Sequence, residues 1–94
     1  MSLCPFFSIV LPTYNRAHLL SRAIDSVLKQ SFADWELIIV DDGSIDNSCK
    51  LLQTYTEKHS QISFIANPHQ GLAKSRNAGI QIAKGLYLTF LDSD

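Results

Sequence analysis

The chain has 94 residues, with eight basic and nine acidic side chains and a formal net charge of −1 at neutral pH. This length is enough for one modest domain. The near-zero charge argues against a protein that binds nucleic acid or a membrane surface through bulk electrostatics. No apolar stretch is long enough to span a membrane, and the apolar N-terminus lacks the basic start of a signal peptide.

The first half of the chain predicts a strand, a helix and a second strand. Residues 6–12 (FFSIVLP) form a short apolar, β-branched run that ends at Pro12, as expected of a buried strand. Apolar residues recur at helical spacing over residues 17–30. Residues 35–42 (WELIIVDD) are a second apolar run, and they are followed by turn-forming residues.

The second half repeats this alternation. A helix runs to about Lys58, and residues 62–67 (ISFIAN) form a third strand. Residues 72–84 form a third helix, after which Gly85 is placed to adopt the left-handed conformation that often ends a helix. Residues 86–92 (LYLTFLD) form the fourth strand.

The order β-α-β-α-β-α-β predicts a Rossmann-like α/β fold with a parallel sheet and right-handed crossovers. In such a sheet the carboxyl ends of all strands lie along one edge, where ligands bind near the point at which the strand order reverses. Polar residues follow three of the strands, at 13–16, 41–42 and 92–94. The sequence therefore predicts a ligand site along this edge.

Single residues of this edge leave alternatives open. Asp41 and Asp42 can cap the helix that follows them, but Asp42 can equally accept hydrogen bonds from a nucleotide base or ribose. Asp46 is assigned to helix capping. Lys74 and Arg76 lie near the start of the third helix, where they either approach an anionic ligand or are simply solvated.

Asp92 and Asp94 follow the fourth strand with one residue between them. In an extended conformation their side chains face the same side and repel each other. A hard divalent cation removes this conflict, because Mg²⁺ and Mn²⁺ prefer oxygen ligands and often bind one or two carboxylates together with phosphate oxygens. The pair therefore predicts a metal–diphosphate site, the alternative being an acidic chain end with no role.

Other nucleotide-binding classes fit the sequence poorly. There is no GxGxxG after the first strand and no GxxxxGK[ST] motif, which disfavours a dinucleotide dehydrogenase and a P-loop NTPase. A receiver-like signalling domain needs its acidic pair after the first strand, where this chain has PTYN. A nucleotidyltransferase needs a glycine-rich basic loop there. These last two remain the alternatives.

Three segments, SIVLPTYNR, LIIVDDGSIDNS and GLAKSRNAGIQIAKGLYLTFLDSD, resemble in order and spacing the nucleotide-sugar-binding half of family 2 glycosyltransferases, which have the GT-A fold. The resemblance runs from about Phe7 to Asp94. It implies that Pro12, Thr13 and Tyr14 contact the nucleotide, with Tyr14 packing against the base.

The resemblance also implies roles for the acidic and basic residues of the site. Asp42 recognises the base, with uracil favoured, and Asp41 is its less committed neighbour. Arg76, in the "RN" pair of the third helix, contacts the diphosphate. Asp92 faces the ribose or the sugar, and Asp94 holds Mn²⁺ or Mg²⁺ in the DXD motif.

The resemblance implies an inverting, metal-dependent transfer of a sugar from a nucleotide-sugar donor, favoured to be a UDP-sugar, to a hydroxyl of a glycan or lipid acceptor, in polysaccharide or glycan synthesis. The catalytic base lies beyond Asp94 in the family. We therefore expect residues 1–94 to be a single partial domain that lacks the acceptor-binding half and is inactive alone. We expect no nucleic-acid partner, self-association through an exposed fourth strand, and a cytoplasmic location, at the cytoplasmic face of the membrane for a full-length enzyme.

Overall fold

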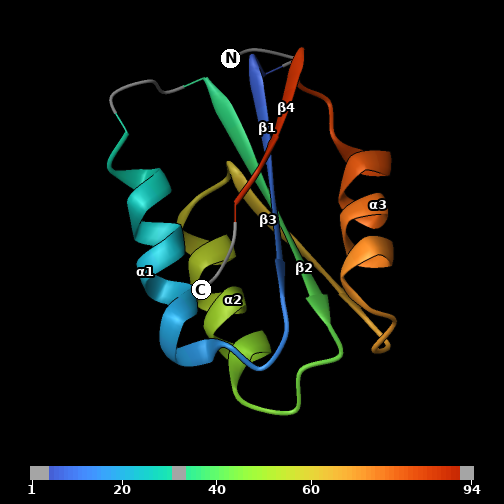
Figure 1. Cartoon of the computed structure of the whole chain (residues 1–94). Coiled ribbons are helices and arrows are strands. Elements are labelled where there is room, and N and C mark those ends of the chain that lie inside the picture. The colour runs from blue at the N-terminus through green and yellow to red at the C-terminus, as the bar shows by residue number, and fades with distance from the viewer. Residues whose placement is uncertain (1–4, 31–33, 92–94) are drawn as a thin grey trace.

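The computed structural model describes residues 5–30 and 34–91. Their strands and helices alternate in the expected order (Figure 1). The elements are β1 (Phe7–Thr13), α1 (Ala17–Leu28), β2 (Trp35–Asp42), α2 (Ser48–Lys58), β3 (Ile62–Asn67), α3 (Leu72–Ile82) and β4 (Tyr87–Phe90). This alternation confirms the α/β class.

The strands form one parallel sheet in the order β3-β2-β1-β4. The chain moves outward from β1 through β2 to β3, and then crosses back to place β4 on the other side of β1. The order therefore reverses at β1. In open parallel sheets, this reversal leaves a crevice at the carboxyl ends of the strands.

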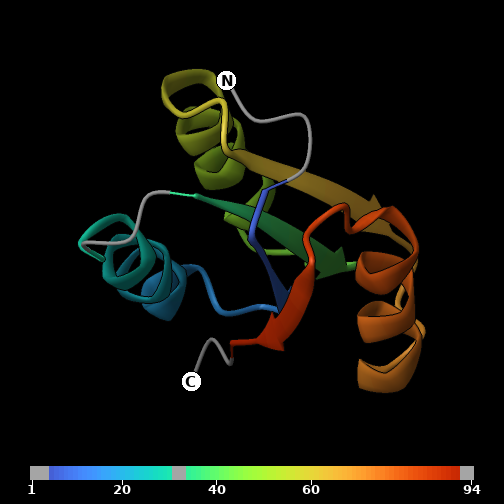
Figure 2. The ribbon, with the colours of Figure 1, turned by 90° about the horizontal axis from the view of Figure 1, so that it is seen from above.

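Helices cover both faces of the sheet, with α1 and α2 on one face and α3 on the other (Figure 2). The alternation of side chains along β1 explains the two layers. Ile9 and Leu11 pack in the core beneath α1 and α2, whereas Val10 between them packs on the α3 side. Ile39 and Ile38 of β2 divide in the same way.

Helices α1 and α3 pack on the sheet in different ways. Helix α1 buries Leu20, Ala23, Ile24 and Val27, whose spacing places them along one stripe. Helix α3 lies close to β1 because Gly79 has no side chain: a Cβ there would lie 2.5 Å from Val10 Cγ1. No helix within residues 5–30 and 34–91 combines the length and the apolar character needed to cross a lipid bilayer.

The predicted role of Gly85 as a left-handed helix end is wrong. Helix α3 ends earlier, at Ile82, with Ala83 as its extended cap, and the described glycines with positive φ are Gly43 and Gly71. Gly85 is needed for a different reason. A Cβ at this position would lie 2.6 Å from both the backbone nitrogen and Oγ of Ser8. The glycine thus lets the α3–β4 connection run directly against β1.

Strand β4 is an exposed edge strand, as expected. Among the described strands it pairs with β1 alone, from Phe7↔Tyr87 to Val10↔Phe90, and all four of its residues are exposed. The large apolar side chains exposed along this part of the chain are Leu86, Tyr87, Leu88 and Phe90. Because β4 carries no charge or proline, nothing in it opposes pairing with another strand.

Candidate functional site

Three loops meet at the carboxyl ends of β1, β2 and β3. Thr13 at the end of β1 is the register partner of Asp41, and Asp42 is the register partner of Asn67. The sequence prediction that the segments after β1 and β2 converge is confirmed. The segment between β3 and α3 joins them, and residues 92–94, which the prediction also placed at this edge, lie outside the described residues.

Asp42 holds the start of α3. The side chain is buried, and its Oδ1 and Oδ2 accept the backbone N–H groups of Gln70 (2.7 Å) and Gly71 (3.0 Å). Burial raises the pKa of Asp42, but the two N–H donors, the neighbouring His69 and the Ser75 hydroxyl together outweigh it and hold this pKa below its ordinary value. Asp42 is therefore an anion at neutral pH.

Asp41 has a structural role. It is 1% exposed, and its carboxylate accepts hydrogen bonds from the backbone N–H (3.0 Å) and the hydroxyl (2.5 Å) of Ser44. The Cys49 thiol lies 3.6 Å from the same carboxylate. Burial, together with this negative charge, raises the pKa of that thiol. These contacts fix the loop between β2 and α2 and do not cap α2, which begins at Ser48.

Asn15 and Ser44 tie the β1–α1 loop to the β2–α2 loop. The backbone N–H of Asn15 donates to Ser44 Oγ (2.8 Å), and Asn15 Oδ1 accepts the N–H of Ile45 (2.8 Å). Asn15 adopts a positive φ of 49°, which asparagine tolerates better than most residues. The neighbouring Tyr14 is 41% exposed.

His69 contacts both residues to which base binding is assigned. Its ring is stacked on that of Tyr14, with 4.2 Å between centroids and 28° between planes, and its Nδ1 lies 2.9 Å from Asp42 Oδ2. Sequence reasoning missed His69 as a site residue. The signal was available, because NPHQ follows the third parallel strand and therefore lies at the same edge as the other loops.

Pro12 and Thr13 are the last two residues of β1 and both are buried. The backbone oxygen of Val10 accepts the N–H of Leu91, which follows β4. Backbone groups of residues two apart in a strand point to the same side, so those of Pro12 also point toward the β4 side. Because proline has no N–H, it offers no donor there. Thr13 is buried, and its Oγ1 has no hydrogen-bond partner, so the end of β1 contains a buried hydroxyl group whose hydrogen bond is unmade.

Arg76 lies between α3 and the end of β4. Its guanidinium carbon is 5.4 Å from the centroid of the Phe90 ring, and its Nε is buried without a hydrogen-bond partner. The side chain is half-buried, whereas Lys74 and Asn77 are exposed. Such a cation held against β4, with an unpaired N–H, is suited to an anionic ligand.

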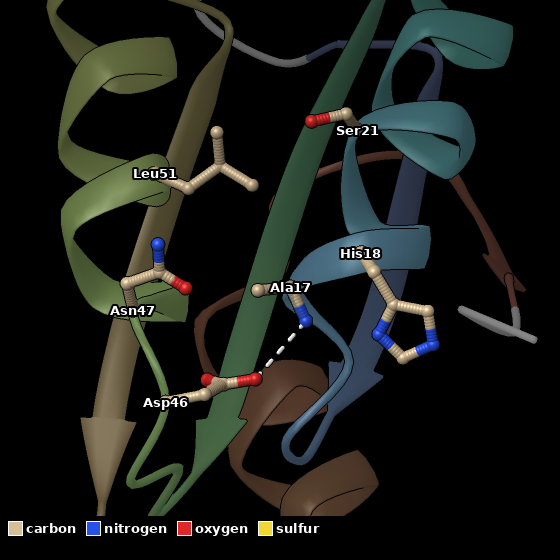
Figure 3. A pocket seen from close by; sticks show the side chains of 6 residues that line it. All are labelled: Ala17, His18, Ser21, Asp46, Asn47 and Leu51. Atoms are coloured by element: carbon tan, nitrogen blue, oxygen red, sulfur yellow. Dashed lines mark hydrogen bonds between the residues drawn. The ribbon is translucent and has the colours of Figure 1, made fainter.

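A pocket of about 490 Å³ lies between the first turns of α1 and α2 (Figure 3). Asp46 occupies the space between these two helix ends. Its Oδ2 accepts the N–H of Ala17 (3.2 Å), and its Oδ1 accepts the N–H (3.0 Å) and the hydroxyl (2.5 Å) of Ser48. The predicted capping role of Asp46 is confirmed, and because it already satisfies these donors, we assign no ligand to this pocket.

Replacing Asp46 by alanine should lower the free energy of unfolding by about 1–2 kcal/mol near neutral pH. The hydroxyl of Ser48 is the main cause that holds the pKa of Asp46 below its ordinary value. The contribution of the Asp46 carboxylate to the free energy of unfolding is therefore present above about pH 4 and is lost as the pH falls through its lowered pKa. Urea unfolding at about pH 6 and about pH 3 measures both effects.

The matched control is Asn47→Ala, because Asn47 caps α2 without a side-chain hydrogen bond. This variant should change stability little and equally at both pH values. An Asp46→Ala variant that is as destabilised at low pH as at neutral pH would contradict the capping role.

The described part of the chain contains no group of three or more His, Cys, Asp or Glu side chains that could hold a metal ion. The two acids at the carboxyl ends of the strands, Asp41 and Asp42, are occupied by N–H and O–H donors. The carboxylates predicted to hold a divalent cation, Asp94 with its neighbour Asp92, lie outside the described residues.

Comparison with known proteins places this architecture in a family. The family model "Glycosyl transferase family 2" matches residues 8–94. A UDP-Glc:alpha-D-GlcNAc-diphosphoundecaprenol beta-1,3-glucosyltransferase of Escherichia coli is 41% identical over 88 residues, which are 93% of this chain and 34% of that protein. The chain spans 26–36% of the length of the first three curated relatives.

Solved structures show the same fold. The chain resembles S. aureus TarS 1-349 in complex with UDP, with a TM-score of 0.87 and 30% identity, over 95% of this chain and 27% of that one. It also resembles GalNAc-T7 with UDP, GalNAc and Mn²⁺, with a TM-score of 0.84 and 27% identity, over 96% and 18% of the two chains. The fold is therefore that of GT-A glycosyltransferases, and the chain belongs to glycosyl transferase family 2.

Proposed function

We propose that this chain binds a nucleotide-diphospho-sugar donor, favoured to be a UDP-sugar, together with Mn²⁺ or Mg²⁺. It would do so as the donor-binding part of an inverting glycosyltransferase that transfers the sugar to an acceptor hydroxyl in cell-surface polysaccharide or glycan synthesis. The observation that carries the proposal is that the exposed Tyr14 ring and the anionic carboxylate of Asp42 both contact one side chain, His69, at the same edge of the sheet.

This pairing suits a pyrimidine base. An aromatic ring offers a face for stacking, and a carboxylate accepts a hydrogen bond from a ring N–H. Uracil has such an N–H. Relatives support a UDP donor, since one named protein uses UDP-Glc and one solved structure contains UDP.

The remaining residues are suited to the diphosphate and the sugar. Arg76 carries a positive charge beside β4, and its Nε–H is buried without a partner; its guanidinium group would bind phosphate oxygens. Asp92 is assigned to the ribose or the sugar. Asp94 would hold the cation, which supplies Lewis-acid stabilisation of the departing nucleoside diphosphate. The GalNAc-T7 complex with UDP and Mn²⁺ supports this assignment.

Thermal unfolding with UDP, GDP or TDP, each with and without Mn²⁺, tests the proposal. We expect UDP to raise the midpoint most, and to do so more strongly with Mn²⁺ than with EDTA. An Asp94→Ala variant should keep the metal-independent part of the shift and lose the metal-dependent part. If none of the three nucleotides changed the unfolding midpoint, donor binding would be contradicted.

Sugar transfer needs a base that takes the proton from the acceptor hydroxyl, and none of the residues described at this edge is assigned that role. We therefore keep the prediction that the 94-residue chain binds a donor without transferring its sugar. Detection of sugar transfer by the purified chain would contradict this prediction.

Self-association through β4 also stays a prediction, and a monomer at every concentration in sedimentation would contradict it. The cytoplasmic location stays a prediction that cell fractionation tests.

A further inference from the structure

The imidazole of His69 makes the same two contacts at this edge that a base would make. It covers one face of the Tyr14 ring at a centroid distance of 4.2 Å. Its Nδ1 lies 2.9 Å from Asp42 Oδ2 and 3.1 Å from the backbone oxygen of Asp42. Both of these atoms are acceptors, so Nδ1 carries the proton and donates it.

His69 closes access to the carboxylate. The two Asp42 oxygens already accept the N–H groups of Gln70 and Gly71, and the Asp42 side chain is 7% exposed while that of His69 is 58% exposed. A flat ring with an N–H at its edge therefore reaches Asp42 only where the imidazole now lies. We infer that His69 acts as an internal base mimic that closes the base subsite and must swing out when the nucleotide binds.

The geometry allows this movement without a change in the backbone. The segment around His69 is fixed by the N–H bonds of Gln70 and Gly71 to Asp42. It also packs against Gly43, where a Cβ would lie 2.6 Å from the backbone nitrogen of His69. The imidazole itself is mostly exposed, so a change of side-chain rotamer is enough to move it, and such changes are fast for exposed side chains.

The consequence is a lower apparent affinity for the nucleotide. When only a fraction of the molecules is open, the apparent affinity falls by that fraction. The inference rests on the proposed nucleotide site and specifies what controls entry to it. Replacing His69 by alanine should therefore tighten UDP binding, by about three- to tenfold.

The chain offers a matched control. His59 is also stacked on a tyrosine, Tyr55, with 6.5 Å between ring centroids, but it follows α2 at the opposite end of the sheet. His59→Ala should leave UDP affinity unchanged. A His69→Phe variant keeps a ring for Tyr14 and loses the N–H donor to Asp42, so it should tighten UDP binding less than His69→Ala does.

The experiment is isothermal titration of the 94-residue chain and the three variants with UDP and Mn²⁺, together with NMR of the imidazole protons. We expect UDP to shift the His69 signals and leave those of His59 in place. If the wild-type chain binds UDP but His69→Ala binds it equally or more weakly, the inference is overturned and the proposed function stands. If neither the wild-type chain nor His69→Ala binds UDP, the proposed function fails, and the inference fails with it.

Discussion

Replacing Asp42 by asparagine should weaken UDP binding by roughly ten- to hundredfold, because the variant loses a charge-assisted hydrogen bond worth about 1.5–3 kcal/mol. The asparagine keeps the size of the side chain and one oxygen acceptor for the N–H groups of Gln70 or Gly71. The midpoint of thermal unfolding should therefore fall only slightly. Titration calorimetry with UDP and Mn²⁺ measures the affinity.

Asp42→Ala should show the second role of the same carboxylate. This variant leaves the N–H groups of both Gln70 and Gly71 without their acceptor, so it should be destabilised by about 1–3 kcal/mol as well as impaired in binding. The control is Asp25→Ala, which removes an exposed carboxylate on α1 that accepts the Tyr55 hydroxyl (2.9 Å). If Asp42→Asn bound UDP as tightly as Asp25→Ala does, a base-binding role for Asp42 would be contradicted.

Gly85→Ala should destabilise the fold by at least about 3 kcal/mol and lower the unfolding midpoint by roughly 12–24 °C. The added Cβ would lie 2.6 Å from the backbone nitrogen of Ser8 and 2.8 Å from the carbonyl carbon of Phe7. These atoms belong to the central strand β1 and cannot move without disturbing the sheet. The variant also weakens the bond from the Gly85 N–H to Ser8 Oγ (2.7 Å). Thermal and urea unfolding measure the effect.

Gly71→Ala is the control for this substitution. Gly71 has a φ of 100°, and a Cβ there would meet no atom within 4 Å, so alanine at this position introduces backbone strain of about 1–2 kcal/mol without a clash. Adding Ser8→Ala to Gly85→Ala removes the hydroxyl contact and leaves the nitrogen contact, so it should restore stability only in part. If Gly85→Ala were no less stable than Gly71→Ala, close packing would not be the reason for this glycine.

The apolar patterns of the sequence were sufficient to predict the order of the elements. Short β-branched runs alternate with helical stripes, and strands of this kind have to lie parallel between helices. Parallel strands place their carboxyl ends together, so the sequence was sufficient to predict that the segments containing Tyr14 and Asp42 lie at one edge of the sheet. The family resemblance then supplied their roles, and the family match confirmed the resemblance.

Only the tertiary structure separated the two aspartates at the end of β2. Successive side chains of a strand point to opposite faces. Asp41 therefore faces Ser44 in the β2–α2 loop and Cys49 in the first turn of α2, whereas Asp42 faces the residues before α3. The role of each carboxylate therefore depends on which face of the sheet its side chain points to. A local pattern of two adjacent acids contains no information about which helix covers which face.

The same limit applies to contacts between segments that are distant in the sequence. The pairing of His69 with Tyr14 and the contact of Gly85 with Ser8 join residues that are 55 and 77 positions apart. Local propensity assigned Gly85 to a helix end, and it left His69 without a role. The sequence by itself determined the strands, the helices and the edge at which polar residues gather. The crossing of β4 to the far side of β1 and the packing of α3 decided which of those residues meet.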